Sequence, residues 1–156
     1  MTTPPAKTIE SLGTDDGGRW VTARVGPRGV RADISAGAHD WIVDEPLAVG
    51  GTGAGPTPYD YLLSAVSSCM AITLRMYADR KGWPLEGASV RLRTARAHRA
   101  DCANCETTEV GITRLERQIE LVGPLTDEQR QRLLQIADRC PVKQTLQRGM
   151  EIETVE

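Results

Sequence analysis

Short segments rich in apolar residues, separated by turn signals, fill the first third of the chain and predict short strands. Residues 19–25, 30–36 and 39–43 are rich in β-branched and aromatic residues, and glycines and a proline separate them. We therefore expect an antiparallel meander. The glycine-rich residues 48–58 follow, without the lysine of a phosphate-binding loop, and are expected to form a flexible connection.

After this segment, apolar residues recur every three or four positions, which predicts one long helix. Thr57 can cap it, Pro58 fits its first position, and Gly82 can end it. The helix would contain roughly 24 residues and be about 36 Å long, which suggests a central spine or a subunit contact. Its buried face is expected to consist of Leu62, Ala65, Val66, Cys69, Ile72 and Met76, which follow the i, i+3, i+4, i+7 spacing.

In the second half of the chain, the spacing of apolar residues is typical of strands in some segments and of a helix in another. Residues 88–98 and 115–121 read as strands because their apolar positions repeat every second residue. Thr126 and Gln129 form the capping box of a second helix, which Pro141 follows. The apolar face of that helix is expected to contain Leu133, Ile136, Ala137 and Cys140.

The order of these elements indicates a single α+β domain. Residues 150–155 are expected to form a closing strand. We place the domain at residues 19–156 and expect residues 1–18, which are polar and contain proline and glycine, to form a flexible lead-in. The length of 156 residues suits one domain.

Composition narrows the classes of partner. The net charge is −2 and the basic residues are spread along the chain, which argues against a nucleic-acid partner. No run approaches the ~18 apolar residues of a membrane span, and the N-terminus lacks the apolar segment of a secretory signal. We therefore expect a cytoplasmic protein without a membrane partner. Thiols stay reduced there, so the four cysteines are expected to be catalytic, metal-binding or inert.

Two of the cysteines lie on the apolar faces of predicted helices. Cys69 is in the middle of the long helix, and Cys140 ends the second helix where Pro141 can open a third. As N-cap of the third helix, Cys140 would lie beside free N–H groups, which favour a thiolate. Both faces pack on one core, so we expect the two thiols to come within disulfide reach, about 7 Å between Cα atoms. Alternatively, each thiol is only a small buried residue.

The chain resembles the OsmC/Ohr family of thiol-dependent peroxidases, named for osmotically inducible protein C and organic hydroperoxide resistance protein. The resemblance runs from Trp20 to the C-terminus, and it rests on GGTGAGPTPYDYLLSAVSSCMAITLRMYADRKGWPLEG and LTDEQRQRLLQIADRCPVKQTL. It is closer to the broad OsmC-like branch than to the strict peroxidases. It implies an intertwined α+β homodimer, with antiparallel sheets around long central helices.

The resemblance also implies a reaction. Cys69 matches the family's peroxidatic cysteine, which attacks an organic hydroperoxide and becomes a sulfenic acid. Cys140 matches the resolving cysteine, which condenses with that sulfenic acid to a disulfide. An external dithiol would then reduce the pair, and no cofactor is required.

The family assists the thiol with an arginine from an early strand or loop and with a carboxylate that holds this arginine. Arg31 is the best positional match for the arginine, and Arg28 is the alternative. The strict peroxidases have a glutamate ten positions before the cysteine, where this chain has Tyr59. Asp60, one position later, and Glu45 are the candidate carboxylates, although in an unbroken helix Asp60 would face away from the thiol.

A rival group of residues lies in the second half of the chain. Cys102 and Cys105 have C-x-x-C spacing, and His98 precedes them by four positions. This spacing is compatible with half of a zinc site, with a redox dithiol or with an ordinary loop that contains two thiols. A closed zinc site needs more ligands than these residues supply. We therefore expect no metal. The alternative function is an OsmC-like small-molecule or metal-binding protein with weak or no peroxidase activity.

Overall fold

The computed structural model describes residues 20–96 and 112–154 of the chain. The chain divides into two compact units, Met1–Pro58 and Tyr59–Glu156, and each is described by itself. The lead-in expected at residues 1–18 lies outside the described residues. The expectation of one domain over residues 19–156 stays a prediction.

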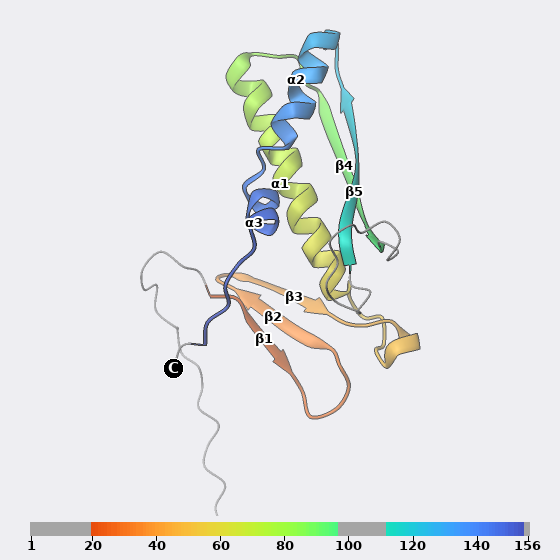
Figure 1. Ribbon diagram of the computed structural model, residues 1–156. Helices are drawn as coiled ribbons and strands as arrows, with labels where there is room; N and C mark the ends of the chain where they lie inside the picture. The colour runs from red at the N-terminus through yellow and green to blue at the C-terminus, as the bar shows by residue number, and fades with distance from the viewer. Residues whose placement is uncertain (1–19, 97–111, 155–156) are drawn as a thin grey trace, which may run out of the picture. The chain divides into compact units, whose positions relative to one another are not determined.

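The described part of the first unit contains the predicted antiparallel meander (Figure 1). Strands β1 (Thr22–Val25), β2 (Ala32–Ala36) and β3 (His39–Val43) pair in the order β1-β2-β3. Ile34 pairs with Trp41 across the sheet and is buried. The three strands predicted from their composition and from the turn signals between them are therefore confirmed.

The glycine-rich segment after β3 is ordered by one buried carboxylate. Asp44 is 1% exposed, and it accepts hydrogen bonds from the backbone N–H groups of Glu45 (2.8 Å), Thr52 (3.0 Å) and Ala54 (3.0 Å) and from the Thr52 hydroxyl (2.6 Å). These bonds, that of the Thr52 hydroxyl first, hold the pKa of Asp44 well below its usual range. The expected flexible connection is therefore wrong, because the carboxylate satisfies backbone groups from both ends of the loop.

Two glycines of this loop allow the backbone to close around Asp44. A Cβ atom at Gly51 would lie 1.7 Å from the carbonyl oxygen of Glu45, and one at Gly55 would lie 2.6 Å from that of Ile42. A short 3-10 helix, η1 (Leu47–Val49), lies within the same loop. Glycine is required at both positions because a side chain would overlap the backbone.

The second unit combines helices with a two-stranded antiparallel sheet (Figure 1). Its elements are α1 (Pro58–Lys81), β4 (Gly87–Arg96), β5 (Ile112–Val122), α2 (Asp127–Ala137) and α3 (Pro141–Arg148). Helix α1 begins at the last residue of the first unit. The strands predicted at residues 88–98 and 115–121 and the predicted helices are therefore present among the described residues, and the fold class is α+β.

Local signals set the ends of α1 and α2. Gly82 adopts a positive φ of 63°, and the N–H of Trp83 donates to the carbonyl of Ala78 at 2.9 Å, which ends α1 as predicted. At the start of α2, Thr126 and Gln129 each accept a hydrogen bond from the backbone N–H of the other. The predicted capping box is confirmed.

The predicted buried face of α1 is partly wrong. The buried residues are Val66, Met70, Leu74 and Ala78, which follow one i, i+4 row. Four members of the predicted face are exposed, namely Leu62, Ala65, Ile72 and Met76. Apolar residues occur on more than one side of α1, so the period alone does not identify the face that packs.

The core of the second unit has two adjoining parts. One contains the buried residues Leu74, Ala78, Leu85, Leu125, Leu133 and Ala137, with Ile119 and Leu121 of β5 packed against them. The other contains Val66, Met70 and Cys140. The predicted apolar face of α2 is confirmed, because Leu133, Ile136, Ala137 and Cys140 are all buried.

The expected closing strand is absent from the described residues 150–154. Ile152 is 93% exposed and Met150 is 65% exposed. Their alternating pattern suits a strand, but a strand also needs a neighbour, and no described strand pairs with this segment.

By length and composition alone, α1 would pass as a membrane-spanning helix. The core helix of a globular protein passes the same test, and α1 buries one row of its side chains inside the second unit. This observation is therefore weak evidence for a membrane span.

Candidate active site

The second unit brings two distant thiols together. Cys69 lies in α1 and Cys140 lies between α2 and α3, 71 residues later, yet their Sγ atoms are 2.6 Å apart. This separation is far shorter than a sulfur–sulfur van der Waals contact, and both cysteines are free thiols. The predicted proximity of the thiols is confirmed, whereas their catalytic roles stay a prediction.

Cys140 is held in place by the start of α3. Its Sγ accepts a hydrogen bond from the backbone N–H of Lys143 at 3.4 Å, and Pro141 occupies the first position of the helix. Cys140 is therefore the N-cap predicted from the Cys-Pro dipeptide. Because N-cap geometry fixes the backbone of Cys140, it also fixes the direction of the sulfur toward α1.

The two thiols differ in their access to solvent. Cys140 is fully buried and packs with Val66 and Met70, whereas Cys69 is only partly buried. The Sγ of Cys140 also lies 3.9 Å from the carbonyl oxygen of Val66. A molecule arriving from solvent would therefore meet Cys69 before Cys140.

Burial raises the pKa of the Cys140 thiol, and the neighbouring Cys69 raises it further. The backbone N–H groups of Lys143 and Val142 act in the opposite direction. The N-cap position therefore favours the thiolate of Cys140, as expected, but desolvation and the second sulfur outweigh the helix start. Cys140 therefore keeps its proton at neutral pH.

An ion-pair network anchors the segment that carries Cys140. Asp138 caps the C-terminus of α2, and its Oδ1 accepts from Nη1 of Arg117 at 2.7 Å and also contacts Nζ of Lys143. The two cations, Arg117 first, lower the pKa of Asp138, so its carboxylate is ionised at neutral pH. The network links β5 to both sides of the α2–α3 junction.

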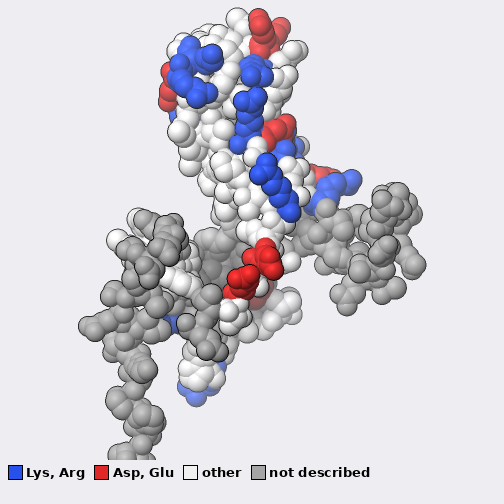
Figure 2. Space-filling model, turned by 60° about the vertical axis from the view of Figure 1, so that its left-hand side comes forward, with Lys and Arg blue, Asp and Glu red and all other residues white. Residues whose placement is uncertain are grey.

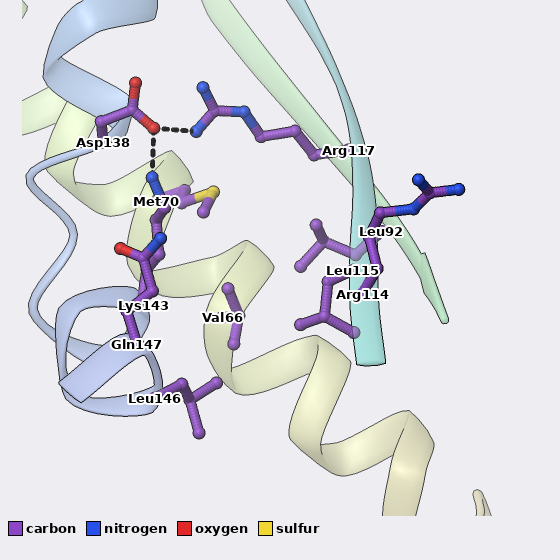
Figure 3. Close-up of a pocket in the computed structure, with 10 residues that line it drawn as sticks. All are labelled: Val66, Met70, Leu92, Arg114, Leu115, Arg117, Asp138, Lys143, Leu146 and Gln147. Carbon is purple, nitrogen blue, oxygen red and sulfur yellow. Dashed lines mark hydrogen bonds and ion pairs between the residues drawn. The ribbon is translucent and has the colours of Figure 1, made fainter. Parts of the chain in front are cut away.

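A pocket of about 530 Å³ lies beside this network (Figure 3). Val66 and Met70 line it, and the same two residues pack against Cys140. Figure 3 shows Arg117 reaching from β5 toward Asp138, while Leu92 and Leu115 point toward Val66. Neither sulfur lines the pocket, so the pocket and the dithiol are separate features of one core.

The candidate arginines belong to the first unit. Arg31 is exposed just before β2 and forms an ion pair with Asp33 at 2.7 Å, and Arg28 is exposed in the turn before it. Glu45 adjoins the Asp44 loop. Cys69 belongs to the second unit, so the expected action of Arg31, Arg28 or Glu45 on this thiol stays a prediction.

Asp60 lies in the first turn of α1. The helix is unbroken between Asp60 and Cys69, and nine residues correspond to two and a half turns and about 13 Å along the axis. Asp60 therefore lies on the side of α1 opposite Cys69, as expected. Its proposed role as the family's carboxylate stays a prediction, which the helical geometry does not favour.

Sequence reasoning did not single out Asp44, whose carboxylate accepts four hydrogen bonds. The signal was available, because a carboxylate directly after a strand and before a glycine-rich segment suits a loop-closing role.

The rival metal group, His98 with Cys102 and Cys105, lies outside the residues that the structure describes. Within the described ranges, no group of three His, Cys, Asp or Glu residues could hold a metal ion, and His39 is an exposed residue of β3.

Comparison with known proteins places these features in a family. Residues 51–155 match the family described as OsmC-like protein. No protein of curated function matches the chain.

Solved structures share the fold at low sequence identity. An OsmC-like protein from Mycoplasma pneumoniae is 18% identical, with a TM-score of 0.68 over 85% of this chain and 89% of its own. The organic hydroperoxide resistance protein OsmC from Legionella pneumophila is 18% identical, with a TM-score of 0.57 over 86% and 90%. An OsmC-like protein of unknown function from Vibrio cholerae is 12% identical, with a TM-score of 0.66 over 83% and 93%.

Proposed function

Because the chain belongs to the OsmC family, we propose that it is a thiol-dependent peroxidase that reduces organic hydroperoxides to alcohols. The observation that carries this proposal is the pair of free thiols, Cys69 and Cys140, whose sulfur atoms are 2.6 Å apart. Its similarity in fold to a Legionella pneumophila protein named for organic hydroperoxide resistance supports the choice of substrate class.

The two thiols have different roles in the proposed reaction. Cys69 attacks as a thiolate because it is the accessible member of the pair, whereas Cys140 is buried and protonated. The sulfur of Cys69 forms a bond to the distal oxygen of the hydroperoxide, and the O–O bond breaks. The alkoxide takes a proton and leaves as an alcohol, and Cys69 becomes a sulfenic acid.

Cys140 then resolves the sulfenic acid. Its sulfur attacks the sulfur of Cys69, the S–O bond breaks, and the proton of Cys140 leaves with the hydroxide as water. An external dithiol supplies two electrons and two protons to regenerate both thiols. The proximity of the sulfurs supports this step because little movement is required to form the bond.

The proposal includes a cation and a second subunit. Arg31 is proposed to stabilise the thiolate of Cys69, because a partly buried anion needs a nearby positive charge.

A homodimer is proposed because α1 exposes apolar residues, including Ile72 at 58% and Met76 at 67%. We propose a cytoplasmic location, where a cellular dithiol is available as the reductant.

One observation favours a second candidate function. Tyr59 occupies the position where the strict peroxidases have a glutamate, so the carboxylate that orients the arginine is missing there. The alternative is a small-molecule-binding or metal-binding protein with weak or no turnover.

Mass spectrometry after one equivalent of cumene hydroperoxide separates the two functions. A peroxidase loses two hydrogen atoms, and peptide mapping under non-reducing conditions places the new bond between Cys69 and Cys140. The Cys140→Ser variant should instead gain one oxygen atom at Cys69. A wild-type protein that stays unmodified, or that links only Cys102 and Cys105, would reject the peroxidase.

A further inference from the structure

The pocket beside the dithiol has one apolar end and one charged end (Figure 3). Its apolar wall consists of Val66, Met70, Leu92, Leu115 and Leu146, which come from α1, β4, β5 and α3. Its volume of about 530 Å³ falls within the range of small-molecule sites, roughly 300–1,000 Å³. An apolar wall of this kind selects a ligand with a hydrocarbon portion.

The charged end has more positive than negative charge. Arg117 and Lys143 both contact the same carboxylate oxygen of Asp138, so two cations share one anion. Arg114 also lines the pocket and forms its ion pair with Glu116, which pairs with Arg93 as well. Three basic residues, Arg114, Arg117 and Lys143, therefore line the pocket together with one carboxylate, that of Asp138.

At the charged end of the pocket, Arg117 has N–H groups beyond the one that it donates to Asp138. Arg117 uses Nη1 in its hydrogen bond to Asp138, and a guanidinium carries five N–H donors in a planar fork. Arg117 and Lys143 are partly buried, with side chains that are 31% and 24% exposed. Partial burial strengthens the attraction of such cations for an anion, because less water screens it.

The charged residues that line the pocket are three cations and one anion. Figure 2 shows basic side chains over the second unit, with acidic ones dispersed among them. The acidic residue that lines the pocket, Asp138, is already engaged by two cations. A second carboxylate would therefore be drawn to the charged end, whereas an ammonium group would be repelled.

We propose that this pocket binds an aliphatic carboxylate of medium chain length. Its carboxylate would contact Arg117 and Lys143, and its chain would lie along the leucines, Val66 and Met70. This is a ligand site that the peroxidase reaction does not use, because neither Cys69 nor Cys140 lines it. The ligand needs no hydroperoxide group.

The test uses the reduced full-length protein and decanoate as the probe, followed by isothermal titration calorimetry. Decanol and decylamine have the same chain with a neutral or a positive head, and acetate has the head without the chain. Decanoate should bind at least about tenfold more tightly than each of the other three compounds, because only decanoate satisfies both ends of the pocket. High salt should weaken its binding.

Variants assign the binding to this pocket. Arg117→Met should weaken decanoate binding by about tenfold and leave decanol unchanged, because it removes a charged hydrogen bond but little apolar surface. The matched control is Arg93→Met, which removes a charge from the adjacent strand but not from the pocket lining. Leu146→Ala should weaken both decanoate and decanol.

Three results would each reject the site. They are equal affinity for decanoate and decanol, no decanoate binding at millimolar concentration, and an equal loss of decanoate affinity in the Arg117→Met and Arg93→Met variants. Circular dichroism checks that the variants fold, and Lys143→Met serves in place of Arg117→Met if that variant does not. Because decanoate does not oxidise thiols, failure here is independent of failure of the proposed peroxidase.

Discussion

At the scale of single residues, the environment gives two identical thiols different chemistry. Cys140 combines full burial, an N-cap hydrogen bond and a sulfur neighbour, and burial raises its pKa. Cys69 is the partly exposed residue of the pair. A buried, protonated thiol next to an accessible one suits a resolving and an attacking role.

The first prediction separates these roles by mutation. Cys69→Ser should abolish hydroperoxide consumption, since the attacking atom is lost. Cys140→Ser should consume one equivalent of hydroperoxide and then stop, because the sulfenic acid has no partner. Peroxide assays in rapid-mixing experiments measure both, and a Cys69→Ser protein as fast as the wild type would contradict the assignment.

The second prediction concerns the cation. Arg31→Met should slow the alkylation of Cys69 by iodoacetamide at neutral pH by about tenfold, because fewer thiolates exist without a nearby positive charge. The difference should shrink at high pH, where thiols ionise without assistance. Arg24→Met, at an exposed position of β1, is the matched control, and Arg28→Met tests the alternative arginine. Superimposable rate profiles for wild type and Arg31→Met would remove Arg31 from the site.

The third prediction concerns the pH dependence of Asp44. Its pKa is lowered in the folded protein, so its stabilisation is fully present above the ordinary aspartate pKa of about 4. This stabilisation should be lost progressively as the pH falls from that value toward the lower pKa of the folded state. Asp44→Asn should lower the melting temperature at pH 7 by on the order of 5 °C and flatten its pH dependence below about pH 4.

Circular dichroism melts between neutral and acidic pH measure this effect. Asp40→Asn is the control, because Asp40 is an exposed residue of the adjacent strand β3. Parallel pH profiles for wild type and Asp44→Asn would show that the carboxylate does not stabilise the loop.

At the scale of elements, helix α1 shows what a hydrophobic pattern leaves open. The Thr-Pro start and the glycine at the end defined its length, since each acts within one turn of the helix. Its buried face depends instead on which elements cover it, and the row through Leu74 packs against β4, β5 and α2.

The fourth prediction tests this face. Leu74 is fully buried, so Leu74→Ala should lower the free energy of unfolding by about 2–5 kcal/mol through lost burial and a cavity. Ser68→Ala, at an exposed position of the same helix, should change it by about 0.5 kcal/mol or less. Urea titrations give both values, and similar costs for the two variants would contradict the observed orientation of α1.

At the scale of the whole molecule, the apolar residues that α1 leaves exposed need an explanation. Ile72 and Met76, one helical turn apart on α1, are both more than half exposed, and neighbouring exposed apolar residues can mark an interface. A second copy of the chain would cover them in the proposed homodimer.

The fifth prediction is therefore an obligate dimer. Sedimentation at micromolar concentration should give twice the 17.0 kDa of the chain, and the double variant Ile72→Lys, Met76→Lys should shift the protein toward monomers or aggregates. Arg80→Lys, on the same helix, serves as the control. A stable wild-type monomer would contradict the dimer.

The sequence by itself determined the features that depend on neighbouring residues along the chain. Strands β2 and β3, the capping box of Thr126 and the N-cap position of Cys140 were all predicted correctly. Each of these signals involves hydrogen bonds or side-chain directions within a few residues, which any sequence displays directly. The meeting of Cys69 and Cys140 followed from two apolar faces in one core.

Only the tertiary structure decided the features that depend on burial and on distant partners. The pKa of Cys140 is set by desolvation and by Cys69, the order of the glycine-rich loop by the carboxylate of Asp44, and the buried face of α1 by the elements packed against it. The expected strand at residues 150–154 is absent because a pattern supplies one strand but not its partner. Desolvation and pairing are properties of the folded surroundings, so the local sequence does not determine them.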